Sequence, residues 1–249
     1  MRLNSLSKRV VTMLLAIIIT LLGVTGCMSK KPNPEEIKNK MITYLQEKYG
    51  EEFVPISLSL RDHAYSSDRL YAYPKKGTKK DLFEVSGQQE DGSYVMHDGY
   101  FGIYIKPEYE KVLSGFVGEI YKDFKLYTNF SEGVLPDRLN KNTQVEEIYS
   151  KDEYFFSDTA IFVKESSAKG IDGEESLRKI AEKMKDKKMV GSVDIYVVFD
   201  NKFGAADLNA LNLTPSEEKA FFLEKRKSIK VTDELQVKKY GEGENSSNG

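Results

Sequence analysis

Helical periodicity is clearest at two places in the chain. Apolar side chains recur every three or four residues along residues 37–49 and again along residues 109–124, which is the spacing of one buried helix face. Asn33-Pro34-Glu35-Glu36 predicts the start of the first helix, with Asn as the N-cap and Pro in the first turn, and Gly50 predicts its end. Pro107 is predicted to open the second helix.

Two more helices and a series of strands complete the pattern. Asp172-Gly173-Glu174-Glu175 and Thr214-Pro215-Ser216-Glu217 both combine an N-cap residue with Glu in the first turn, so each predicts a helix start. Alternation of apolar and polar residues predicts strands at residues 54–60, 70–73, 82–85, 94–105 (one or two strands), 154–163, 193–199 and 229–237. Pro55 places the first strand at a sheet edge or a bulge.

The order of these elements predicts an α+β fold. Short strands joined by Gly-containing turns favour a mainly antiparallel sheet, packed by the amphipathic helices. The polar segment 129–142 is a candidate hinge, so the body is predicted to form two small α+β halves, residues 34–128 and 143–240. Residues 241–249 have almost no apolar side chain and are predicted to be disordered.

The first residues have the layout of a secretory signal. Arg2, Lys8 and Arg9 form a positively charged start, and an uncharged run follows from residue 10 to residue 24. This run leads into Val24-Thr25-Gly26-Cys27, which places an aliphatic residue and two small residues before a cysteine. Cys27 is the single cysteine, so no disulfide forms within the chain.

Val24-Thr25-Gly26-Cys27 resembles the lipobox of bacterial lipoproteins, with Val24 standing where Leu is commonest. The resemblance implies diacylglyceryl transfer to the Cys27 sulfur and cleavage after Gly26, which makes residues 1–26 a signal peptide and residues 27–33 a tether. Acyl chains such as palmitate would then hold Cys27 in membrane lipid, because two chains give stable attachment. The expected location is the extracytoplasmic face of the cell membrane. The alternative is an uncleaved transmembrane helix over residues 10–29.

Composition narrows the class of partner. Residues 1–26 contain three basic residues and no acidic one, so their removal changes the formal charge from −2 to −5. A mildly acidic body argues against nucleic acid as a partner, because non-specific binding to phosphate needs a basic face. The chain is rich in lysine and tyrosine and lacks tryptophan. In this it is similar to small uncharacterised lipoproteins of low-GC Gram-positive bacteria.

No pattern of chemically active residues points to an enzyme or to a cofactor. His63 and His97 lack the spacing of a zinc site. Ser166-Ser167-Ala168-Lys169 resembles the Ser-x-x-Lys nucleophile motif of penicillin-binding proteins, but the Lys-Thr-Gly element of that family is missing. Asp200-Asn201-Lys202-Phe203-Gly204 departs from a calcium loop because Lys202 occupies a ligand position. We therefore expect no catalytic residue, no metal ligand and no cofactor.

Tyrosines gather between the two long predicted helices and form the candidate binding surface. The expected binding residues are Tyr71, Tyr73, Tyr94, Tyr100 and Tyr104. Tyrosine rings on a sheet stack on glycan or contact a peptide. Tyrosine is also a common strand residue on half-buried faces, so the same residues are explained by structure alone.

The sequence as a whole predicts a non-catalytic envelope lipoprotein that binds a protein or a cell-wall component. A ligand-capturing lipoprotein of a transporter is the alternative, and a cell-wall enzyme with scattered carboxylates is a third class. A deep cleft near residues 129–142 would favour ligand capture. Two buried, facing carboxylates would favour the enzyme, and a shallow tyrosine surface would favour the interaction protein.

Overall fold

The computed structural model describes residues 33–62, 64–130 and 135–239. The predicted signal peptide, Cys27, nearly all of the predicted tether and the predicted tail lie outside these residues. The chain divides into two units, residues 1–37 and residues 38–249. The described part of the first unit, residues 33–37, is the start of a helix in which Asn33 Oδ1 accepts a hydrogen bond from Glu35 N at 3.1 Å, as its predicted N-cap role requires.

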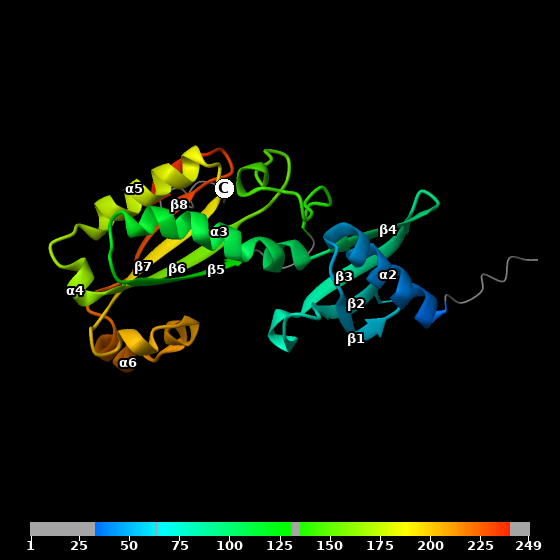
Figure 1. The fold of residues 1–249 in the computed structure, drawn as a ribbon, viewed down its shortest axis with the longest axis horizontal. Coiled ribbons are helices and arrows are strands. Elements are labelled where there is room, and N and C mark those ends of the chain that lie inside the picture. The colour runs from blue at the N-terminus through cyan, green and yellow to red at the C-terminus, as the bar shows by residue number, and fades with distance from the viewer. Residues whose placement is uncertain (1–32, 63, 131–134, 240–249) are drawn as a thin grey trace, which may run out of the picture. The chain divides into compact units, whose positions relative to one another are not determined.

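Two open sheets, one of four and one of five strands, carry the fold (Figure 1). All neighbouring strands but one pair are antiparallel. The predicted α+β fold with mainly antiparallel sheets packed by helices is therefore confirmed. No helix in the described part of the chain has the length and the apolar character needed to cross a membrane.

The first sheet is a meander in chain order. Its strands are β1 (Phe53–Ser59), β2 (Asp68–Pro74), β3 (Phe83–Glu90) and β4 (Ser93–Asp98), and the short 3₁₀ helix η1 (Lys79–Asp81) precedes β3. β1 is an edge strand whose register shifts between Pro55 and Ser57, so the prediction of a sheet edge or a bulge at Pro55 is confirmed. The helix α2 (Pro34–Tyr49) contributes Met41 and Leu45 to the core, and it ends before Gly50, which has φ +69°.

The helix α3 (Tyr100–Gly118) begins two turns earlier than predicted. The prediction of strand at residues 100–105 is therefore wrong, and Pro107 lies inside the helix rather than at its start. Every fourth residue of α3 is buried, and this set consists of Phe101, Ile105, Tyr109, Leu113 and Val117. Aromatic and β-branched residues before Pro107 favour strand locally, but their four-residue spacing lets them share one buried helical face.

The second sheet contains a parallel pair. Its strands, in spatial order, are β5 (Phe124–Phe130), β6 (Ser157–Lys164), β7 (Gly191–Val198), β8 (Lys227–Val231) and β9 (Val237–Lys239). β6 and β7 are parallel and are joined through α4 (Glu165–Ala168) and α5 (Gly173–Asp186), as a crossover connection requires.

Two features of the second sheet differ from the sequence analysis. β5 was not predicted, and it pairs with β6 through all seven of its residues. The single strand predicted at residues 229–237 is a hairpin of β8 and β9, with Leu235 in the turn at φ +56°. The predicted division into residues 34–128 and 143–240 stays a prediction, although residues 124–130 belong to the second sheet.

Both faces of the second sheet are covered (Figure 1). α3 and α5 lie on one face. The other face carries η3 (Phe203–Ala205), η4 (Leu208–Asn212) and α6 (Pro215–Phe221), which bury the apolar cluster of Ala160, Phe162, Val198, Ala206 and Ala210. Asp172 Oδ1 accepts hydrogen bonds from the first turn of α5, and Thr214 and Glu217 form a capping box on α6. Both predicted helix starts are confirmed.

A pair of glycine substitutions tests the packing between β6 and β7. A Cβ atom on Gly191 would lie 2.0 Å from Ser157 Oγ and 2.3 Å from Ser157 O, whereas a Cβ on the exposed Gly115 of α3 meets nothing within 4 Å. We expect Gly191→Ala to lower the free energy of unfolding by about 2 kcal/mol or more through overpacking. We expect Gly115→Ala to raise it by about 0.5–1 kcal/mol, because alanine is the better helix former. Urea unfolding of both variants checks this, and equal effects would contradict it.

Candidate functional site

The five candidate tyrosines do not share one surface. Tyr71 and Tyr73 lie two residues apart on β2, so both point to the face opposite Leu70 and Ala72, and both are half-buried. Tyr94 is on β4, and its hydroxyl donates to the buried Asp68 at 2.8 Å. The structure therefore brings Tyr71 and Tyr73 together and places Tyr94 on the opposite face of the sheet.

The other two candidates belong to α3 rather than to the sheet. Tyr100 is 1 % exposed and donates to Glu51 Oε2 at 2.6 Å. Tyr104 donates to the carbonyl oxygen of Lys141 at 3.1 Å. Burial, reinforced by the hydrogen bond to Glu51, raises the pKa of Tyr100. The hydroxyls of these two tyrosines are therefore engaged in hydrogen bonds within the protein. A binding role for all five tyrosines stays a prediction.

Asp98, at the end of β4, is the most heavily hydrogen-bonded buried carboxylate of the described residues. Oδ2 accepts from Tyr44 and Lys48, both at 2.8 Å, and Oδ1 accepts from Tyr49 at 2.8 Å and from Tyr100 N at 2.9 Å. Burial first, and then the charge of Asp98, raises the pKa of Tyr44 and of Tyr49. Because each carboxylate oxygen already has two donors, Asp98 is a structural group rather than an acid or base facing a ligand.

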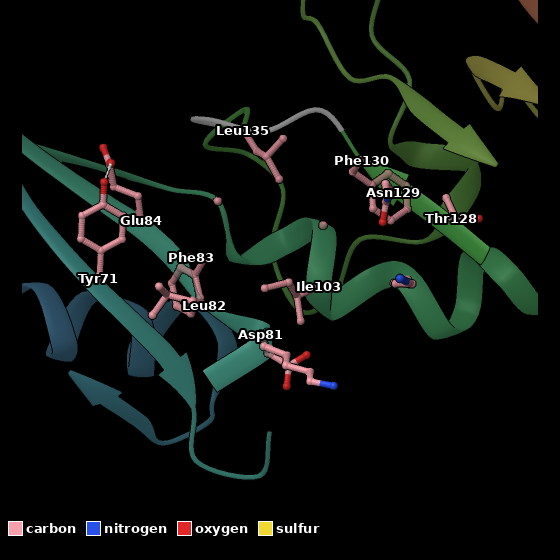
Figure 2. A pocket seen from close by; sticks show the side chains of 14 residues that line it. Tyr71, Asp81, Leu82, Phe83, Glu84, Ile103, Thr128, Asn129, Phe130 and Leu135 are labelled. Atoms are coloured by element: carbon pink, nitrogen blue, oxygen red, sulfur yellow. Dashed lines mark hydrogen bonds between the residues drawn. The ribbon is translucent and has the colours of Figure 1, made fainter. Parts of the chain in front are cut away.

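A cavity of about 670 Å³ lies beside Tyr71 (Figure 2). Apolar side chains form much of its wall, namely Tyr71, Leu82, Phe83, Ile103, Phe130 and Leu135. Polar and charged groups at the same cavity are Lys80, Asp81, Glu84, Lys106, Thr128 and Asn129. Figure 2 shows the hydrogen bond that joins Tyr71 and Glu84. Apolar walls with a few polar groups are typical of binding sites.

Hydrogen bonds involve three of the residues that line this cavity, Tyr71, Glu84 and Thr128. The Tyr71 hydroxyl donates to Glu84 Oε2 at 2.8 Å, and this bond raises the pKa of Tyr71. Glu110 Oε1 accepts from Thr128 N at 2.7 Å, on the outer side of the edge strand β5. Leu82 is 44 % exposed, which is high for a large apolar side chain. The cavity thus combines the hydrogen-bonded Tyr71–Glu84 pair with exposed apolar surface, which suits non-covalent binding.

A second cavity, of about 710 Å³, lies at the end of the second sheet where β6 and β7 finish. At this cavity the Ser-x-x-Lys segment that begins at Ser166 meets the segment that begins at Asp200, 34 residues later. Ser166 N donates to Asp200 Oδ1 at 2.9 Å. This bond lowers the pKa of Asp200. Lys169 lines the same cavity. Sequence reasoning missed this meeting because it depends on the parallel pairing of β6 with β7.

The histidines give no metal site among the described residues. His97 Nδ1 lies 2.8 Å from Asp137 Oδ1, and His63 lies outside the described residues. Within residues 33–62, 64–130 and 135–239 there is no group of three or more His, Cys, Asp or Glu side chains placed to hold a metal ion.

A substitution at Asp98 tests its structural role. Asp98→Asn replaces two carboxylate acceptors by one and leaves the part-buried Lys48 ammonium without its counter-charge, so we expect the free energy of unfolding to fall by about 3 kcal/mol. Glu52→Gln is the control, because its ion pair with Lys75 is 66 % and 67 % exposed and surface pairs contribute little. Urea unfolding measures both, and an Asp98→Asn protein as stable as the control would contradict the assignment.

Similarity to a known protein is found among solved structures. No family model matches this chain, and no curated protein matches it. The chain is similar to a DUF5037 family protein from Ruminococcus gnavus ATCC 29149, known from a crystal structure. The two are 18 % identical, the match covers 79 % of this chain and 91 % of that one, and the TM-score is 0.41.

Proposed function

We propose that this protein is an exported lipoprotein held by lipid on Cys27 at the extracytoplasmic face of the membrane. The carrying observation is Val24-Thr25-Gly26-Cys27 directly after an uncharged run with basic residues before it. The chain has one cysteine, and it stands at the position that lipid transfer requires. A diacylglyceryl group supplies two acyl chains, and each buried CH₂ contributes about 0.8 kcal/mol, so the attachment is stable.

The folded part is proposed to be a non-catalytic module that binds an envelope protein or a cell-wall component through the cavity beside Tyr71. Support comes from the make-up of that cavity, which is lined by the exposed Leu82 and the half-buried Tyr71 together with Lys80, Glu84 and Asn129. Aromatic and apolar side chains with polar groups around them are the usual composition of a binding patch.

Lipid labelling tests the anchor. In cells fed a labelled fatty acid, the wild-type protein is expected to incorporate label, and Cys27→Ala is expected to lose it completely because no other thiol exists in the chain. Ser29→Ala is the matched control, since it lies just outside the tetrapeptide and should be labelled like the wild type. Undiminished labelling of Cys27→Ala would refute the anchor.

Site-specific crosslinking in intact cells tests the binding surface. A photoreactive amino acid at Leu82, in the wall of the cavity, is expected to capture a discrete envelope partner. The same group at Tyr154, which is 71 % exposed and does not line the cavity, is the control. Capture from Tyr154 but not from Leu82, or only free monomer from both, would overturn the assignment of the surface.

A further inference from the structure

Four separate stretches of the chain build the cavity at the end of the second sheet. It is lined by the segment after α3, by the connection from α4 to the first turn of α5, by the end of β7 with the turn that follows it, and by the segment that leads from α6 into β8. In Figure 1, α4 lies at this end of the sheet. Ligands of α/β sheets collect outside the carboxyl ends of parallel strands, because the loops there converge.

Charges of both signs line this cavity. The acidic groups are Glu165, Asp172, Asp200 and Glu224, and the basic groups are Lys169 and Lys227. Most of them are already engaged. Asp172 accepts from two backbone N–H groups of α5, Asp200 accepts from Ser166 N, and Lys227 Nζ lies 2.5 Å from Glu224 Oε2.

Glu165 and Lys169 remain available. Glu165 Oε2 accepts a single long hydrogen bond, 3.4 Å, from Asp200 N. Lys169 forms no hydrogen bond or ion pair with any residue that the structure describes. The two stand four residues apart, a spacing that normally pairs opposite charges on a helix. They stay unpaired because α4 ends at Ala168 and Lys169 is extended, with φ −60° and ψ +121°.

An apolar wall adjoins these two charges. Leu223 is 48 % exposed, and Ile171 and Val197 line the same cavity. Leu223 is held in place because its N–H donates to the carbonyl oxygen of Val197 at 2.8 Å. A short aliphatic group on a ligand would cover this surface and remove it from water, at about 25 cal/mol per Å² of apolar area.

We propose that this cavity binds a free amino acid with an aliphatic side chain. The α-ammonium group is placed at the Glu165 carboxylate, the α-carboxylate at the Lys169 ammonium, and the side chain against Leu223. A ligand with only one charge leaves either Glu165 or Lys169 without an opposite charge. The site therefore favours ligands that carry both charges over ligands that carry one. The proposal concerns a different cavity from the one assigned to partner binding, and it is independent of the anchor on Cys27.

Three small molecules test the proposal on the full-length chain purified in detergent. Leucine carries both charges, 4-methylpentanoate lacks the ammonium group, and 3-methylbutylamine lacks the carboxylate. Isothermal titration is expected to show saturable binding of leucine and binding at least about tenfold weaker for each analogue, the usual effect of losing one charged hydrogen bond. Absence of leucine binding, or equal binding of all three, overturns the proposal.

Two variants assign the charges to the side chains. Lys169→Met is expected to weaken the binding of leucine about tenfold and to leave the binding of 3-methylbutylamine unchanged. Glu165→Gln is expected to weaken the binding of leucine and to leave the binding of 4-methylpentanoate unchanged. Lys179→Met, on the exposed face of α5 and paired with Glu175, is the control and should bind leucine like the wild type. Leucine binding that is unchanged in both cavity variants overturns the assignment.

Discussion

The fold around the first sheet depends on hydrogen bonds to one buried carboxylate. Asp98 ends β4, accepts hydrogen bonds from three side chains of α2, and also accepts from the first N–H of α3. Its carbonyl oxygen accepts from Leu135 N at 3.3 Å. Taking a carboxylate out of water is costly unless donors replace the water. The position of α2, the end of β4 and the start of α3 are therefore set together, because moving any one of them would leave the charge short of donors.

This constraint explains where the sequence analysis failed at α3. Pro107 is a good first-turn residue, and the aromatic residues before it favour strand, so local signals agreed on a helix that starts at Pro107. The real start is fixed by Asp98, whose partners are about fifty residues away in α2. No local pattern reports that partnership. Local pattern does indicate hydrogen bonds between residues of the same helical turn. For this reason the N-caps at Asn33, Asp172 and Thr214 were predicted correctly.

The missed parts of the second sheet have the same origin. β5 was overlooked because its residues, Phe124–Phe130, mix apolar and polar side chains and become a strand through pairing with β6. Its free edge is protected by Glu110, which takes the outward N–H of Thr128, and this protection comes from a neighbouring helix. Parallel pairing of β6 and β7 is likewise invisible in their sequences. It carries Glu165 and Asp200 to the same end of the sheet, so the second cavity is a consequence of topology.

The abundance of tyrosine also has a structural reading, which narrows the binding prediction. Tyr44, Tyr49, Tyr94 and Tyr100 each donate a hydroxyl to a carboxylate, at Asp98, Asp68 or Glu51. Hydrogen bonds to ionised acceptors are roughly twice as strong as neutral ones, so tyrosine is an efficient way to bury a ring and satisfy a charge together. A tyrosine whose hydroxyl donates to a carboxylate has no O–H donor left for a ligand. Tyr71 also donates to a carboxylate, Glu84, but it lies on the other face of its strand and lines a cavity. Its ring is therefore the part of the predicted tyrosine surface that lines this cavity, and in the proposed function Leu82 is the apolar neighbour that a partner would cover.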